Sequence, residues 1–194
     1  MKKIAVITGA SSGMGKRFAE TVDRYGTFDE VWVIARHEAQ LESLRATVPF
    51  PVRVLALDLT DVRLMLEPAI AELAARNRTE EEAQRLTEYC DAVRRRIQAG
   101  EDYLIEDMRF HWYLAKCSHN MVVEPLMPII DAAVVSIANI TRKELLTATV
   151  DTHQEILNDV LDQDPQAARA AVALHLEMNR IVIKHAKERS EKTK

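Results

Sequence analysis

Three short apolar runs alternate with two amphipathic segments over the first sixty residues. The runs KIAVIT (3–8), EVWVIA (30–35) and VRVLALD (52–58) are largely hydrophobic, which is typical of strands buried on both faces. Residues 13–26 and 38–48 between them have helical patterns. The order strand, helix, strand, helix, strand predicts a parallel sheet with right-handed crossovers.

The alternation stops near residue 61, and helical spacing follows. The last of the five glycines is Gly100, and strand-rich folds usually need glycine at their turns, so the C-terminal half should be helical. Thr79 and Glu82 have the spacing of a capping box. The predicted class is α/β plus all-α, with a partial sheet unit at 1–60 and a six-helix antiparallel bundle at 61–190. The six helices are expected at 61–77, 79–100, 101–118, 121–144, 149–163 and 164–189, the fourth being bent or started late by Pro125 and Pro128.

The composition indicates in which compartment the protein is expected and which partners it is expected to lack. The chain of 194 residues is 47% hydrophobic and 29% charged, and it has no apolar run near the roughly 20 residues that span a bilayer. The start lacks a signal core, so we expect a cytoplasmic protein without membrane contact. The net charge of −4 argues against a nucleic-acid surface. Cys90 and Cys117 lack metal or redox spacing and are expected to be buried thiols.

The segment TGASSGMG (8–15) follows the first strand and opens a helix, as in dinucleotide-binding turns. It resembles the start of the short-chain dehydrogenases/reductases, so the unit at 1–60 is expected to be half of a Rossmann fold. Arg36 would then face the 2′-phosphate of NADP, and Asp58 would contact adenine. The implied cofactor-binding residues are Gly9, Ser11, Ser12, Gly13, Met14, Gly15, Arg36 and Asp58.

The catalytic half of that family is missing from the sequence. Its Tyr-x-x-x-Lys pair has no counterpart, because none of Tyr25, Tyr89, Tyr103 and Tyr113 has a lysine four residues later. Dehydrogenase activity is therefore not expected. A sheet without its fourth strand should also leave one face bare, predicted as Val6, Trp32, Val33 and Val54. The helical half or a second copy of the chain should cover it, which favours a homodimer.

Asp107 and His111 carry the candidate chemistry of the helical half. They lie four apart in DMRFHWYLAKCSHN (107–120), so both side chains share one helix face, as a metal site requires. His153 and His175 also stand in helical runs, and His175 has apolar neighbours. The alternative is that each is a core histidine hydrogen-bonded to backbone or to a carboxylate.

Residues 61–188 resemble the ligand-sensing C-terminal module of FadR-type regulators in the GntR superfamily. The resemblance rests on the Arg63-x-x-x-Glu67 start, the Asp-x-x-x-His helix followed by Asn120, and the interval from His153 to His175 across an Asp-Pro turn. It implies a divalent metal held by Asp107, His111, His153 and His175. Such donors suit zinc or nickel, and manganese is possible. Arg63 could clamp an effector's carboxylate, and Asn120 could orient a ligand or cap a helix.

The leading interpretation is an effector-binding module that senses a small carboxylate, fused to a truncated dehydrogenase-like segment. DNA binding is not expected of this chain alone, because that segment stands where such regulators carry a winged helix-turn-helix. An NADP(H)-binding protein without complete catalytic machinery is the alternative. A metallohydrolase is a third possibility, since an open metal site can activate water. It would need a nearby base, and helical spacing turns Glu106 and Glu155 away from the ligand face.

Overall fold

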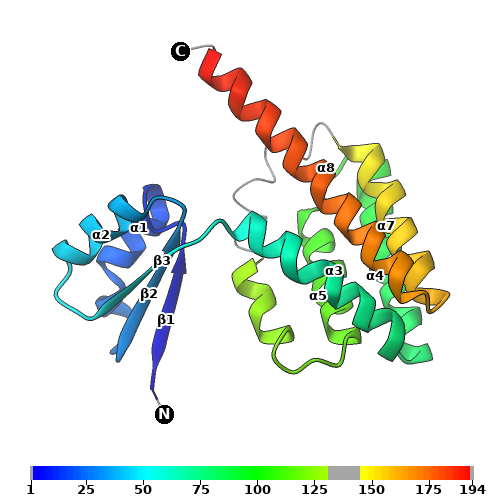
Figure 1. The fold of residues 1–194 in the computed structure, drawn as a ribbon, viewed down its shortest axis with the longest axis horizontal. Helices are drawn as coiled ribbons and strands as arrows, with labels where there is room; N and C mark the ends of the chain where they lie inside the picture. The colour runs from blue at the N-terminus through cyan, green and yellow to red at the C-terminus, as the bar shows by residue number, and fades with distance from the viewer. Residues whose placement is uncertain (1, 131–144, 193–194) are drawn as a thin grey trace. The chain divides into compact units, whose positions relative to one another are not determined.

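The computed structural model describes residues 2–130 and 145–192 (Figure 1). The chain divides into two compact units, residues 1–62 and residues 63–194. Each unit has its own hydrophobic core. Among the described residues, no helix combines the length and the apolar character that crossing a bilayer requires.

The first unit is a three-stranded parallel sheet in the order β1-β2-β3. Strands β1 (Ile4–Thr8), β2 (Glu30–Ala35) and β3 (Val52–Ala56) form inside the three apolar runs of the sequence. Helix α1 (Gly13–Glu20) with the 3-10 turn η1 (Val22–Tyr25) joins the first two strands, and α2 (Glu38–Thr47) joins the last two. Helices α1 and α2 contact each other and pack on the sheet (Figure 1).

One face of the sheet lies under these helices, and it includes two residues that we predicted to be bare. Val33 is 0% exposed in a core that also contains Leu41 and Leu44 of α2. Val54 pairs with Val33 in register and packs against the same core. Their assignment to the bare face was wrong, because neighbouring strand residues point to opposite faces and Trp32 and Val33 are neighbours.

The opposite face carries the other two predicted residues. Val6 and Trp32 pair in register, and Val6 is 39% exposed. The guanidinium of Arg53 lies over the Trp32 ring, 5.3 Å from its centroid, and the Trp32 indole N–H donates to Glu30. This face is therefore partly polar, and the homodimer through it stays a prediction.

The second unit is all-helical in its described part. Its elements are α3 (Leu59–Asn77), α4 (Glu80–Gln98), α5 (Leu104–Cys117), the 3-10 turn η2 (Glu124–Leu126), α7 (Leu146–Leu161) and α8 (Pro165–Lys192). The capping box is confirmed, since the Thr79 hydroxyl accepts from the Glu82 backbone N–H and the Glu82 carboxylate accepts from the Thr79 backbone N–H. Of the predicted helix 121–144, residues 127–130 are helical and residues 131–144 lie outside the described part, so the six-helix count stays a prediction.

In the described part of this unit, these five helices and the helical residues 127–130 bury one hydrophobic core, to which Met127 and Ile130 also belong. Helix α4 contacts both α5 and α7, and α7 contacts α8 (Figure 1). The core residues include Ala71 and Ala74 of α3, Leu86 of α4, Phe110 and Leu114 of α5, Ile156 of α7, and Val172 of α8. Helices α5, α7 and α8 thereby bring the three histidines of the candidate site into one region.

Candidate metal centre

The four predicted ligands come from three helices, and the structure groups the three histidines among them, while Asp107 lies beside His153. Asp107 and His111 lie one turn apart on α5, His153 comes from α7 and His175 from α8. Asp107 is 9% exposed and the three histidines 1–4%. One nitrogen from each imidazole lies within 4.8 Å of the others. The ring centroids are 4.8–5.3 Å apart in all three pairs. Three buried imidazoles in mutual contact are not a pattern that hydrophobic packing explains.

Two contacts between predicted ligands involve His153. Its Nε2 atom lies 3.2 Å from His111 Nε2 and 3.4 Å from Asp107 Oδ1. Two ligand atoms bonded to one tetrahedral zinc at about 2.0–2.1 Å are themselves separated by about 3.3 Å. His153 Nε2 is therefore spaced from each of these two atoms as two ligands of one ion would be, although Asp107 is not part of the group of ligand atoms that lie within 4.8 Å of one another. Nδ1 of His153 is buried and has no hydrogen-bond partner among the described residues.

Behind His111 lies a buried ion pair from α3. Arg63 donates from Nε to one oxygen of Glu67 and from Nη2 to the other, the second contact being 3.2 Å. Glu67 Oε2 is 3.1 Å from His111 Nδ1, close enough for an ion pair although the angle falls outside good hydrogen-bond geometry. Arg63 is 4% exposed, and its bidentate partner is this protein carboxylate. Its role as a clamp for an effector stays a prediction.

The ionisation of these groups follows their surroundings. Burial would raise the pKa of Glu67, but Arg63 and His111 outweigh it and hold that pKa well below its usual range. Burial lowers the pKa of His111, yet the Glu67 carboxylate more than reverses the shift and raises it. Burial raises the pKa of Asp107.

The other two imidazoles are held neutral. Burial, reinforced by nearby positive charge, takes the pKa values of His153 and His175 well below the usual value. A neutral imidazole is the form that binds metals. His153 and His175 therefore present uncharged nitrogen donors beside the Asp107 carboxyl group, while Glu67 favours the charged form of His111.

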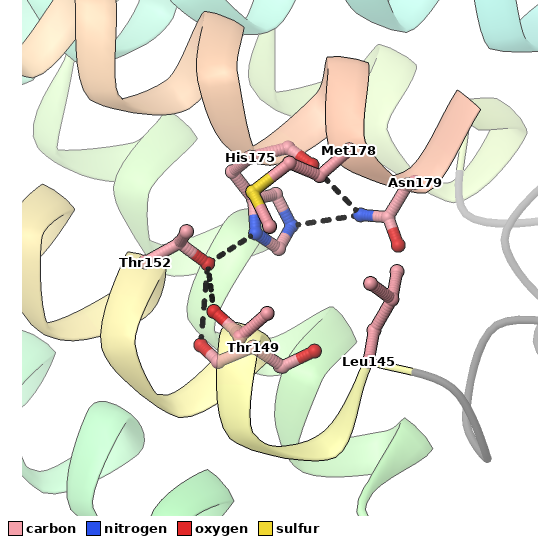
Figure 2. Close-up of a pocket in the computed structure, with 7 residues that line it drawn as sticks. Leu145, Thr149, Thr152, His175, Met178 and Asn179 are labelled. Carbon is pink, nitrogen blue, oxygen red and sulfur yellow. Dashed lines mark hydrogen bonds between the residues drawn. The ribbon is translucent and has the colours of Figure 1, made fainter. Parts of the chain in front are cut away.

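His175 borders a small pocket between α7 and α8, shown in Figure 2. The Thr152 Oγ1 atom lies 2.9 Å from His175 Nδ1, and the Asn179 amide nitrogen lies 3.3 Å from His175 Nε2 (Figure 2). The remaining lining residues are Leu145, Ala148, Thr149 and Met178. None of the seven residues carries a carboxylate, a guanidinium or an ammonium group. A ligand here would meet hydroxyl, amide, imidazole and apolar groups.

The donor set fits a divalent transition metal. Three imidazoles and one carboxylate suit zinc, nickel or manganese. Nδ1 of His153 and of His111 is buried without a hydrogen-bond partner among the described residues, and an unsatisfied buried polar atom costs about 1–3 kcal/mol whether or not a metal is bound to Nε2. Metal-bound histidines usually give that second nitrogen a partner. The described surroundings of His153 lack one, so the ring is oriented by packing and by the contacts of Nε2 with His111 and Asp107.

The glycine-rich turn has the backbone that its spacing predicts. Gly9 and Gly13 have φ values of +65° and +56°, in the region that glycine adopts most easily. A Cβ atom on Gly15 would lie 2.4 Å from the carbonyl oxygen of Gly9, so only glycine fits there. Ser12 precedes α1 as its N-cap residue, while Met14 is 91% exposed. Ser11 is partly buried.

Arg36 and Asp58 meet at the carboxyl ends of β2 and β3. Arg36 Nη1 is 4.0 Å from Asp58 Oδ2, and Asp58 Oδ1 accepts from the Thr60 backbone N–H at 2.9 Å. Asp58 thereby caps the start of α3, a structural role that explains it without a nucleotide. Whether this turn binds NADP stays a prediction.

Other candidate residues have local partners. Asn120 Oδ1 accepts from the Val122 backbone N–H in the turn after α5, which supports its capping role. Glu106 pairs with Arg96 and Arg109. An ion-paired Glu106 is a poor general base, which argues against the hydrolase alternative.

Sequence reasoning missed three residues around the histidines. Glu67 was noted only as part of a motif, although its spacing from Arg63 predicts an ion pair on one helix. Thr152 and Asn179 were not considered. Asn179 follows His175 by one helical turn, so the sequence alone could have predicted a contact between them. Thr152 precedes His153 in sequence but contacts His175, and this contact can be found only in the folded protein.

The comparisons with known proteins concern mainly the helical unit. The FCD domain model matches residues 58–178. A solved structure of Streptococcus agalactiae GntR is similar, with 31% identity and a TM-score of 0.58, over 63% of this chain and 57% of that one. The chain thus spans little more than half the length of that protein. No curated protein matches the chain.

A second solved structure, E. coli McbR/YncC, has a TM-score of 0.60 with 14% identity, over 79% of this chain and 68% of that one. That likeness concerns the fold alone. The FCD match begins at residue 58, so the dehydrogenase-like segment lies almost entirely outside it and its resemblance stays a prediction. Because the FCD model covers more than half of the chain, the protein belongs to the FCD family, the effector-binding domains of GntR-type transcription regulators.

Proposed function

We propose that the helical unit is a metal-containing sensor of a small carboxylate. Asp107, His111, His153 and His175 would hold a divalent cation, with zinc or nickel favoured and manganese possible. The cluster of three buried histidines, with Asp107 3.4 Å from His153, is the observation that carries the proposal. When bound, the cation supplies Lewis-acid positions for carboxylate oxygens.

The protein's own groups explain why a carboxylate is favoured as ligand. The negative charge of Glu67 is already balanced by Arg63. The two positive charges of the cation would therefore face only the single negative charge of Asp107, which leaves a net positive charge at the site. The pocket beside His175 adds hydroxyl and amide groups but no anion. An anionic ligand would bring the charge of the loaded site closer to neutral, which low-dielectric surroundings favour.

Calorimetric titration of the zinc-loaded protein with small mono-, di- and tricarboxylates tests this function. We expect at least one carboxylate to bind roughly 10-fold or more tightly to the loaded protein than to protein treated with a chelator. The amide of the same acid should bind equally to the loaded and the chelator-treated protein, because it lacks the negative charge of the carboxylate. Equal binding of every carboxylate to loaded and chelated protein would contradict the proposal.

Dinucleotide binding by the first unit is the second candidate, favoured by the close packing of Gly15 on Gly9. NADPH fluorescence should then change on adding protein. Arg36→Ala should weaken binding roughly 10-fold or more, because a charge-assisted contact to the 2′-phosphate is lost. Lys16→Ala is a control with a similar change of charge. Absence of any NADPH response in the wild-type protein would exclude this candidate.

A further inference from the structure

Each imidazole has two nitrogens, and only the one without hydrogen can bind a metal. The partner of the other nitrogen decides which one that is. His175 and His111 each have a neighbour whose donor or acceptor character is known, namely Thr152 and Glu67. The tautomers of those two rings can therefore be assigned from the bonds around them.

The Thr152 hydroxyl fixes the tautomer of His175. Oγ1 lies 2.7 Å from the Ala148 carbonyl oxygen and 3.4 Å from the Thr149 carbonyl oxygen. Its single hydrogen goes to the nearer carbonyl, so Oγ1 accepts from His175 Nδ1–H at 2.9 Å (Figure 2). Nε2 of His175 is then without hydrogen. The Asn179 amide donates to it at 3.3 Å, which agrees with that assignment.

The Glu67 carboxylate fixes the tautomer of His111. An ionised carboxylate accepts hydrogen bonds and repels a lone pair, so the nitrogen 3.1 Å from it, Nδ1, carries the hydrogen, although the contact lies outside hydrogen-bond geometry. Arg63 holds Glu67 through both carboxylate oxygens. In the neutral ring Nε2 then carries the lone pair. His153 Nε2, which is 3.2 Å away, donates its hydrogen to that lone pair.

We propose that Glu67 and Thr152 are positioning residues, which keep the hydrogen of His111 and His175 on Nδ1 and so leave Nε2 of each ring free to bind the metal. The inference rests on the proposed metal site. Nδ1 of His111 has only the ion-pair contact with Glu67, at 3.1 Å and outside hydrogen-bond geometry, whereas Nδ1 of His153 has neither a hydrogen-bond partner nor such a carboxylate among the described residues. In the metal-free protein its hydrogen lies on Nε2 and must move or leave before a metal binds.

The two neighbours of His175 provide a discriminating pair of variants. Thr152→Val keeps the shape of the side chain and removes the acceptor for Nδ1–H. It should weaken zinc binding by roughly 10–100-fold, as the loss of such outer partners does. Asn179→Ala should leave zinc affinity at or above the wild-type value, because the Asn179 amide competes with the cation for Nε2. If both side chains only supported the ring mechanically, both variants would weaken binding.

Glu67→Gln tests the partner of His111 and should weaken zinc binding over the same roughly 10–100-fold range. Thr149→Val is the matched control. Thr149 lies three residues before Thr152 on α7 and lines the same pocket. No hydrogen bond joins its side chain to a histidine among the described residues, in contrast to Thr152. It should bind zinc like the wild type. Glu67→Gln removes the carboxylate that pairs with Arg63, so circular dichroism is used to check that this variant folds. If it unfolds, the zinc affinity of Thr152→Val tests the inference.

The experiment combines chelator competition for zinc with nitrogen-15 NMR of the imidazoles in metal-free protein at alkaline pH. We expect hydrogen on Nδ1 of His111 and His175 and on Nε2 of His153, and Thr152→Val should alter the pattern of His175. Wild-type affinity in Thr152→Val, or hydrogen on Nε2 of His111 or His175, would overturn the inference. A wild-type protein that binds no metal would refute the proposed function, while the NMR pattern would still decide the tautomers.

Discussion

A variant with both His153→Ala and His175→Ala is expected to bind zinc about 10⁴-fold more weakly than the wild type. Structural zinc sites gain about 10–16 kcal/mol in total, so each of four ligands contributes about 2.5–4 kcal/mol. Loss of two ligands should then cost at least about 5 kcal/mol, and each 1.4 kcal/mol is a factor of 10. Only Asp107 and His111, from one turn of α5, would remain.

The matched control replaces two histidines outside the cluster. His37 and His119 are both exposed, and His119 Nε2 contacts a carboxylate oxygen of Glu82 at 2.9 Å. The double variant His37→Ala/His119→Ala should retain wild-type affinity in chelator competition. Equal affinity of the two double variants would contradict the ligand assignment, and circular dichroism would exclude unfolding as the cause of a loss.

Phe110→Ala is expected to lower the free energy of unfolding of the helical unit by about 3–5 kcal/mol. Phe110 is 0% exposed in the core of that unit. Its ring centroid lies 4.7 Å from that of His153 and 5.6 Å from that of His111, both in edge-to-face geometry. The substitution therefore opens a cavity directly beside two ligands. A loss of this size is a large fraction of a typical stability of about 5–15 kcal/mol.

Urea unfolding followed by far-ultraviolet circular dichroism measures this loss. The two units can unfold in separate transitions, so the signal of the helices should be fitted on its own. Phe18→Ala is the control, because Phe18 lies in α1 of the other unit and is 46% exposed. A change below about 1 kcal/mol for Phe110→Ala would show that this core position is not packed as described.

The sequence predicted local structure well where a single pattern dominates. The three apolar runs became the three strands, and the Thr79–Glu82 spacing became the capping box. The error on the sheet face arose from ignoring strand alternation, because Trp32 and Val33 cannot lie on one face. The third helix begins at Leu104, later than predicted, since the two acidic residues after Gly100 lie in the connection.

The candidate site shows where sequence reasoning stops. The spacing of Asp107 and His111 establishes a shared face on α5, but which helices meet that face depends on tertiary packing. His153 and His175 were therefore added through a family resemblance and not through periodicity. Glu67 was missed because a charged side chain at 2% exposure is rare, and its burial depends on Arg63 and His111 together.

The central claim is that one divalent cation binds between Asp107, His111, His153 and His175. Anomalous diffraction at the zinc, nickel and manganese edges tests it most directly, on crystals of protein purified without a histidine tag or a chelator. The account predicts a single anomalous peak per chain within bonding distance of these four side chains. A well-ordered cluster in which the four groups contact only one another, with no anomalous peak, would contradict it.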